Sequence, residues 1–493
     1  MPQPPVHRRR RLDPSAGQCY NSSALHLDLL IRDGMICRDD SPPSPGSVGV
    51  RNGCIALVAA SAAGLDASDV IEASGRLVMP GMIDPHVHIG HGAPHASEFW
   101  TEGCSAVVGG VTTLLTYYRR HPFNYLDLVP ELIAGGEANS PIDFSIHLPM
   151  FTRQNLDEMP EYHRRFGITG FKFFPGIKGA DAAVMTALPH TGPMLPVDDT
   201  FVLDGMRVIA TLPGALALYH AENPELNAAA AARIKAEGRA DLRAWCESRP
   251  DHGEAHSVRD GVWWQRLTGC PLYIVHLSSA VALEAVLEER RRSPRASLWI
   301  ETCPQFLTHT RESDIGTIGK MSPPFRARED CDRLWQGVAA GEIQTIASDH
   351  GAFLREDKRD AWTGRSGFPG MATILPALMT HGVRAGRISV ADVVRVFSAN
   401  AARIFGLFPR KGTLAPGADA DVVVVDDRSE RTVEPRALRS RSDFSIYEGQ
   451  PLTGWPTHVI SRGRVLLRDG ELVAERGGGR FLGRSAAVAA ATD

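Results

Sequence analysis

The chain is poor in lysine and has no long apolar run. Only six of its 53 basic residues are lysines, so a lysine inside an apolar strand stands out. No apolar run reaches the roughly 18 residues that span a membrane, and a net charge of −4 gives no basic surface for nucleic acid. The 8 cysteines lack C-x-x-C spacing, which fits reduced thiols. We therefore expect a cytoplasmic protein that partners neither membranes nor nucleic acids.

At 493 residues the chain exceeds one compact core, so at least two domains are expected. Residues 1–25 are rich in Pro, Arg and Ser, which predicts a disordered arm, with targeting or anion docking as alternative roles. Short β-like pieces occur in residues 26–80 and again in residues 406–475. We interpret these two segments as halves of one small composite β-sandwich domain, followed by a tail at residues 476–493.

The middle of the chain, residues 81–405, alternates strand and helix patterns. Helical patterns, such as 227–247 and 281–292, separate most of the strands. The eight candidate strands are 83–89, 110–117, 142–150, 168–175, 215–222, 272–278, 298–305 and 344–350. This α/β pattern predicts a (β/α)8 TIM-type barrel, whose chemistry lies at the carboxyl ends of the strands.

The first barrel strand carries the run Asp84-Pro85-His86-Val87-His88. Side chains alternate along a strand, so Asp84, His86 and His88 face the same way. Two imidazoles on one face can hold a metal ion. The alternative is a strand edge with two ordinary histidines.

Four other strands also end in groups that can bind metal. They are Lys172 in an apolar strand, His220, His276 and Asp349. Each residue has an ordinary interpretation, such as an ion-paired lysine or a packed histidine. Five strand ends with such groups favour two divalent ions, which polarise a carbonyl and generate hydroxide at neutral pH.

These residues carry a family resemblance. Together with other stretches, they make the chain resemble the amidohydrolase superfamily over roughly residues 27–480, and within it the dihydropyrimidinase/hydantoinase branch of cyclic amidases. The other stretches include Cys270-Pro-Leu-Tyr-Ile-Val-His276, Glu301-Thr-Cys-Pro-Gln305, Met321-Ser-Pro-Pro-Phe-Arg326, Ser398-Ala-Asn-Ala-Ala402 and Tyr447-Glu-Gly449.

The resemblance implies a role for each strand-end residue. His86 and His88 would hold one ion and His220 and His276 the other, with Lys172 bridging both as N6-carboxylysine. A bridging hydroxide would attack the amide carbonyl, and Asp349 would bind the first ion and act as general base and acid. Zinc is the expected metal. The family also implies a homodimer or homotetramer.

The chain departs from the family pattern near the substrate. A tyrosine that usually lies five residues after the lysine is Ile177 here, and Tyr117, Tyr118 or Lys178 could replace it as oxyanion donor. The loop at residues 364–371 looks more like allantoinase or dihydroorotase loops, but Gly90 stands where dihydroorotases have arginine. Where the family contacts substrate, this chain has Ser278, Thr302, Cys303 and Gly367.

Three functions remain open from the sequence. The first is hydrolysis of a cyclic amide or imide, a carbon–nitrogen bond outside peptides, as in hydantoinases. The second is a related activity, such as that of an allantoinase, on another amide. The third is a non-catalytic scaffold. Other histidines are interpreted as ordinary: His147 as packed in the core, and His91, His95 and His190 as surface loop residues, with a place at the mouth of the site as the alternative.

Overall fold

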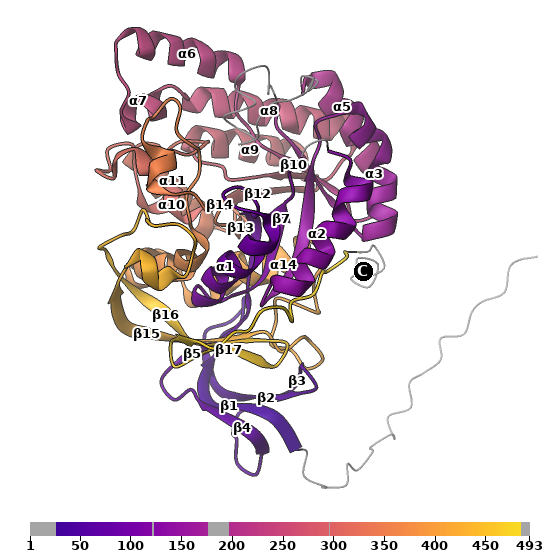
Figure 1. Cartoon of the computed structure of the whole chain (residues 1–493), viewed down its shortest axis with the longest axis vertical. Helices are drawn as coiled ribbons and strands as arrows, with labels where there is room; N and C mark the ends of the chain where they lie inside the picture. Colours follow the sequence, from indigo (N-terminus) through magenta and orange to yellow (C-terminus); the bar gives the residue numbers. More distant parts are fainter. Residues whose placement is uncertain (1–25, 121–122, 176–196, 295, 485–493) are drawn as a thin grey trace, which may run out of the picture.

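The computed structural model describes residues 26–120, 123–175, 197–294 and 296–484. The predictions for the arm at residues 1–25 and for Ile177, Lys178 and His190 lie outside the described residues. Two nine-stranded sheets organise the chain: a barrel of parallel strands and, beneath it in the view of Figure 1, a sheet built from both ends of the chain, which we call the terminal sheet.

The first of these sheets confirms the predicted barrel. Its strands are β6 (Met82–His88), β7 (Val111–Tyr117), β8 (Asp143–Pro149), β9 (Gly170–Phe173), β10 (Leu216–Tyr219), β11 (Leu272–Ile274), β12 (Leu298–Thr302), β13 (Thr345–Ile346) and β14 (His350–Gly351). Consecutive strands from β6 to β13 pair in parallel.

The eighth barrel strand differs from the prediction because it is split. Its first part, β13, pairs with β12, and its second part, β14, pairs with β6, so the sheet closes on itself. Between the two parts, Asp349 has a φ of 52°, which a continuous strand does not allow. The break turns Asp349 out of the ladder at the carboxyl end of the barrel.

Helices surround the barrel (Figure 1). The longer ones are α1 (His95–Val108), α2 (Tyr125–Asn139), α3 (Arg153–Phe166), α5 (Asp199–Ile209), α6 (Pro224–Ala236), α7 (Leu242–Glu247), α8 (Asp251–Thr268), α9 (Ala280–Arg292) and α11 (Arg328–Ala339); the shorter are α10 (Pro304–Thr308), α12 (Ile374–Ala377), α13 (Val390–Val394) and α14 (Asn400–Ile404). The single helix predicted at residues 227–247 is wrong, because the chain turns at Gly238, with φ 72°, between α6 and α7. None of the described helices combines the length and apolarity needed to cross a bilayer.

The terminal sheet combines the two ends of the chain, as predicted. Its strands are β1 (His26–Ile36), β2 (Ser44–Arg51), β3 (Cys54–Ala59), β4 (Asp66–Glu72), β5 (Leu77–Pro80), β15 (Val422–Thr432), β16 (Pro451–Ser461), β17 (Arg464–Arg468) and β18 (Glu471–Leu472). The halves join where β15 pairs antiparallel with β5. Buried aliphatic side chains from both halves, such as Ile31, Val48, Val422 and Ile460, share one core.

Buried charges connect the terminal sheet to the barrel. The Lys411 ammonium lies 2.6 Å from Asp143 Oδ2 on β8, 2.7 Å from Asp421 Oδ2 and 3.0 Å from Asp419 Oδ2. The carboxyl end of the described chain also returns to the barrel, where Phe481 forms a bridge with Phe144 and Arg484 donates to the Ile146 carbonyl at 2.6 Å.

Candidate functional site

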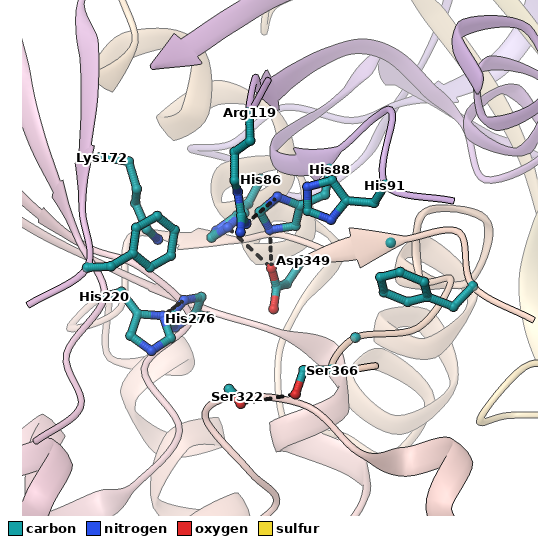
Figure 2. Close-up of a pocket in the computed structure, with 14 residues that line it drawn as sticks. His86, His88, His91, Arg119, Lys172, His220, His276, Ser322, Asp349 and Ser366 are labelled. Carbon is teal, nitrogen blue, oxygen red and sulfur yellow. Dashed lines mark hydrogen bonds and ion pairs between the residues drawn. The ribbon is translucent and has the colours of Figure 1, made fainter. Parts of the chain in front are cut away.

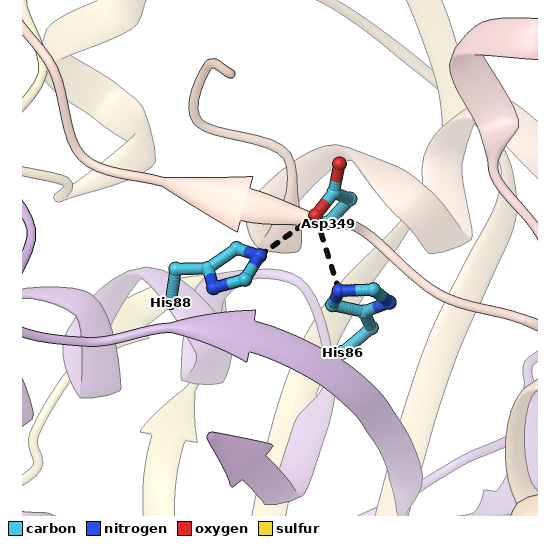
Figure 3. A group of neighbouring side chains, drawn as sticks. All are labelled: His86, His88 and Asp349. Carbon is cyan, nitrogen blue, oxygen red and sulfur yellow. Dashed lines mark hydrogen bonds and ion pairs between the residues drawn. The ribbon is translucent and has the colours of Figure 1, made fainter. Parts of the chain in front are cut away.

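The first strand presents two histidines to one carboxylate. His88 Nε2 lies 2.9 Å and His86 Nε2 3.3 Å from Asp349 Oδ1, and the ligand atoms of the three residues fall within 4.8 Å of one another (Figure 3). Asp84 does not join them. Its carboxylate accepts hydrogen bonds from the Ser348 hydroxyl and amide, 2.5 and 3.1 Å away. Asp84 thereby ties the first strand to the segment that carries Asp349.

A second pair of histidines lies at the ends of β10 and β11. His220 Nδ1 is 2.9 Å from His276 Nε2, and His220 Nε2 donates to Glu222 Oε2 at 2.8 Å. Burial raises the pKa of Glu222, but the charge of Arg249 and the bond to His220 outweigh it and lower the pKa to about 2. Glu222 is therefore a carboxylate that orients His220, the usual arrangement behind a metal-binding imidazole.

Lys172 on β9 is a fully buried amine in an apolar setting. Its side chain is 0 % exposed, and its Nζ lies 5.0 Å from the ring centres of Tyr117 and Phe174. Among the described residues Nζ has no hydrogen-bond partner. Burial lowers the pKa of Lys172 to about 7, so much of the amine is neutral at neutral pH. Native proteins rarely leave such a group unsatisfied, which points to a further bound or covalent group.

Glu301 on β12 supports the site from behind. Its Oε1 accepts from His86 Nδ1 at 2.7 Å and from the His276 amide at 2.9 Å, while Tyr273 donates to Oε2 at 2.9 Å. Because His86 donates from Nδ1, its Nε2 lone pair is directed toward Asp349. Glu301 lies in one of the stretches that resemble the family, but the sequence alone predicted no role for it. Its signal was a carboxylate inside a short apolar strand.

All six predicted metal ligands line one pocket (Figure 2). We call it the strand-end pocket. Its cavity measures about 50 Å³, and its lining residues are His86, His88, His91, Arg119, Lys172, Phe174, His220, His276, Ser322, Asp349, Gly351, Phe353, Ser366 and Gly367. Five of these lining residues were not predicted from the sequence: Arg119, Phe174, Ser322, Phe353 and Ser366. Ser322 lay within the Met-Ser-Pro-Pro stretch.

The predicted substrate residues do not all reach this pocket. Gly367 lines it with a φ of 107°, a conformation that favours glycine. The Tyr117 ring packs 4.2 Å from that of His86 but is not among the lining residues. Ser278, Thr302 and Cys303 also lie outside the lining. The Ser278 hydroxyl donates to Glu254 at 2.9 Å, and the Thr302 hydroxyl donates to the Leu277 carbonyl at 2.8 Å.

Two ordinary histidine interpretations have different outcomes. His147 is packed, as expected, with Nδ1 so close to Gly170 that a Cβ there would lie 1.9 Å away. His91 is not a surface residue, because it lines the strand-end pocket and stacks on His88 with ring centres 4.8 Å apart. Tyr118, one candidate oxyanion donor, lines a neighbouring cavity instead.

Comparison with known proteins agrees with this geometry. A model described as the amidohydrolase family matches residues 298–466. The L-hydantoinase of Paenarthrobacter aurescens is 31% identical over 470 residues, covering 93% of this chain and 98% of that protein. The D-hydantoinase of Ralstonia pickettii is 31% identical over 480 residues, covering 93% and 99%.

Solved structures of hydantoinases and dihydropyrimidinases are also similar to this chain. The dihydropyrimidinase from Brevibacillus agri matches with a TM-score of 0.84 and 28% identity, covering 93% of this chain and 98% of that chain. The L-hydantoinase from Arthrobacter aurescens matches with a TM-score of 0.84 and 30% identity, covering 92% and 99%. The fold of this chain is thus similar to that of solved hydantoinases and dihydropyrimidinases over nearly their whole length. The chain belongs to the amidohydrolase superfamily, in its dihydropyrimidinase/hydantoinase branch.

Proposed function

We propose that this protein hydrolyses a cyclic amide or imide ring of the hydantoin or dihydropyrimidine type, with two divalent metal ions, most simply zinc, in the strand-end pocket. One observation carries the proposal: six residues from five separate strand ends converge on one pocket. The relatives named hydantoinase and dihydropyrimidinase, aligned over nearly their whole length, support the substrate class.

The donor set fits such ions. His86, His88 and Asp349 would hold one ion, since their ligand atoms already lie within 4.8 Å of one another. His220 and His276 would hold the second, since their Nδ1 and Nε2 atoms face each other at 2.9 Å. Lys172 would bridge the two as N6-carboxylysine, which would satisfy its buried Nζ. Mixed nitrogen and oxygen donors suit zinc.

The chemistry divides between the ions and the chain. When bound, divalent ions polarise a carbonyl and lower the pKa of water. Asp349 would take the proton of the attacking water as the C–O bond forms, and would then return it to the leaving nitrogen as the ring C–N bond breaks. Two observations support this role: Asp349 Oδ1 lies toward His86 and His88, and the Asp349 side chain is only 11% exposed.

A related activity such as that of an allantoinase is the second candidate. The loop at residues 364–371 supports it, because Ser366 and Gly367 from this loop line the strand-end pocket and its sequence departs from the branch pattern. The scaffold hypothesis has less support, since the described residues include all six ligands in one pocket.

The test is elemental analysis of the purified protein together with a ring-opening assay on hydantoin, dihydrouracil, allantoin and dihydroorotate. Two metal ions per chain with turnover of hydantoin or dihydrouracil is the expected result. Turnover of allantoin alone would favour the second candidate. Metal-free protein that zinc and bicarbonate do not activate would contradict the proposal and favour a scaffold.

A further inference from the structure

Asp349 has a backbone conformation that residues other than glycine rarely adopt. Its φ is 52°, and such strain persists only where the surroundings fix the chain. Both of its neighbours in the chain are anchored to buried carboxylates. Ser348, on one side, donates to Asp84. His350, on the other side, lies against Glu102, and this second anchor is outside the strand-end pocket.

The buried imidazole of His350 connects helix α1 to the loop after the eighth strand. Its Nδ1 accepts from the backbone amides of Gly370 at 3.1 Å and Met371 at 3.4 Å. Because a backbone amide can only donate, the ring proton of His350 is on Nε2. That nitrogen lies 3.0 Å from Oε2 of Glu102 on α1. The ring is therefore held in one orientation from both sides.

Glu102 is in turn fixed by the segment that leads into the terminal sheet. Its Oε2 accepts from the Ser440 hydroxyl at 2.5 Å, and its Oε1 accepts from the Arg441 amide at 2.9 Å. Both residues precede β16 of the terminal sheet. Arg441 also donates from Nη1 to the Ala352 carbonyl at 3.0 Å. This segment therefore holds the chain just after Asp349 by two routes.

We propose that Glu102 and His350 form a positioning pair, which holds the Asp349 carboxylate where it returns its proton to the leaving nitrogen. The inference rests on the ring-opening function proposed above. His350 and Asp349 are adjacent, so a rotation of the His350 backbone turns the Asp349 side chain away from its place. Neither member of the pair lines the strand-end pocket, so the pair acts through Asp349. A displacement of about 1 Å at the reacting groups costs about 100-fold in rate.

The experiment measures Glu102→Gln on two substrates, hydantoin and thiohydantoin, in which sulfur replaces the oxygen of the carbonyl between the two nitrogens. Glutamine keeps the shape but offers one acceptor oxygen where the carboxylate uses two. The sulfur makes the leaving nitrogen more acidic, so its departure needs less help from an acid. We expect kcat on hydantoin to fall by about 10- to 100-fold relative to the wild type, with KM little changed. The loss on thiohydantoin should be markedly smaller.

A second variant tests the same pair from its other member. In His350→Asn the side-chain oxygen can accept from the amides of Gly370 and Met371, but the shorter side chain does not reach Glu102, so the same difference between substrates is expected. The matched control is Glu161→Gln on α3, a surface carboxylate that pairs with Arg164, and it should behave as the wild type. Melting temperature and metal content at saturating zinc show whether each variant keeps its fold and its ions.

Two kinetic results would overturn the inference: equal losses on the two substrates in Glu102→Gln, or an unchanged kcat on hydantoin. Hydrogen exchange of the Gly370 and Met371 amides gives a measurement that does not depend on turnover. Both amides should exchange faster in Glu102→Gln than in Glu161→Gln, because their acceptor His350 is no longer held. If the wild type opens neither compound, the proposed function is wrong for hydantoins, and unchanged exchange would still overturn the positioning pair.

Discussion

At the residue scale, the site depends on ionisable side chains buried where water cannot satisfy them. Lys172 is the clearest case, because an amine with 0% exposure among aromatic rings is costly unless it is modified or bound. Its neighbours on β9, Phe171 and Phe173, are ordinary core residues. The lysine is therefore the residue whose removal tests the two-ion proposal most directly.

Lys172→Ala is expected to lose both bound ions and hydrolysis, because the bridging ligand is removed. Elemental analysis and the ring-opening assay measure the two effects. Lys235→Ala, at an exposed lysine on α6, is the matched control and should match the wild type. Two ions per chain in Lys172→Ala would contradict the bridging role.

Glu301→Gln is expected to weaken metal binding by about 10- to 100-fold, the usual effect of changing a group that orients ligands. The amide cannot accept from both His86 Nδ1 and the Tyr273 hydroxyl as the carboxylate does. Competition with a chelator measures the affinity. Glu288→Gln on the surface of α9 serves as control, and equal affinities in the two variants would show that Glu301 does not orient the ligands.

The proposed metal ligands could be predicted from the sequence because local strand patterns determine where their side chains lie. Strand alternation puts His86 and His88 on one face, and parallel barrel strands all end at the same rim. Arg119, His91 and Ser366 could not be found in this way. They lie on loops, and where a loop places its side chains depends on tertiary contacts that no periodic pattern records.

At the element scale, the loop after the eighth strand is held by buried lysines. Lys358 donates from Nζ to the carbonyls of Lys320 at 2.6 Å, Arg365 at 2.8 Å and Gly367 at 2.6 Å. Lys320 in turn donates to the Gly364 carbonyl at 2.5 Å. Two of the six lysines in the chain thus fix the loop that brings Ser366 and Gly367 to the pocket.

Lys358→Met is expected to raise KM by about 10-fold and to lower the free energy of unfolding by about 2–3 kcal/mol, because one buried and two part-buried carbonyls lose their donor. Metal content should not change, since the loop supplies no ligand. Steady-state kinetics and urea unfolding measure the effects, with Lys235→Met as control. A stability loss with unchanged KM would show that the clamp has no part in positioning the pocket wall.

The elements themselves were largely predictable, and the exceptions have physical causes. All eight barrel strands follow from apolar runs at regular spacing, but the split of the last one follows from the positive φ of Asp349. His276, another proposed ligand, also has a positive φ, of 39°. Such conformations at non-glycine residues gather at functional sites and cannot be read from residue type.

At the scale of the whole molecule, the barrel and the terminal sheet share one buried charge cluster. Lys411 is 1% exposed and contacts three carboxylates, and Arg462 adds a bond from Nε to Asp143 Oδ2 at 3.1 Å. Burial alone would lower the pKa of Lys411, but Asp421 and Asp143 more than offset it and raise the pKa. Asp143 lies far from Lys411 in the chain, so this contact could not be predicted from the sequence.

Lys411→Met is expected to lower the free energy of unfolding by about 3–5 kcal/mol at neutral pH, the cost of leaving buried carboxylates without their counter-charge. Urea unfolding of the metal-loaded protein measures it. The control is Arg410→Met. Arg410 also contacts Asp419, at 2.9 Å, but its side chain is 49% exposed, so its loss should cost no more than about 1 kcal/mol.

The pH dependence separates a charge effect from lost packing. In the wild type, burial raises the pKa of Asp143, but Lys411 more than offsets this effect. The pKa of Asp143 is therefore below its usual value. That stability is present above the pKa of the unfolded chain and is lost as pH falls. In Lys411→Met, the Asp143 carboxyl is still buried but has lost the charge of Lys411. Burial then favours the protonated carboxyl in the folded state. A lower pH therefore stabilises the variant relative to the wild type. The difference in unfolding free energy should therefore shrink between pH 7 and about pH 4. A difference that stays constant over this range would mean that Lys411 acts through packing alone.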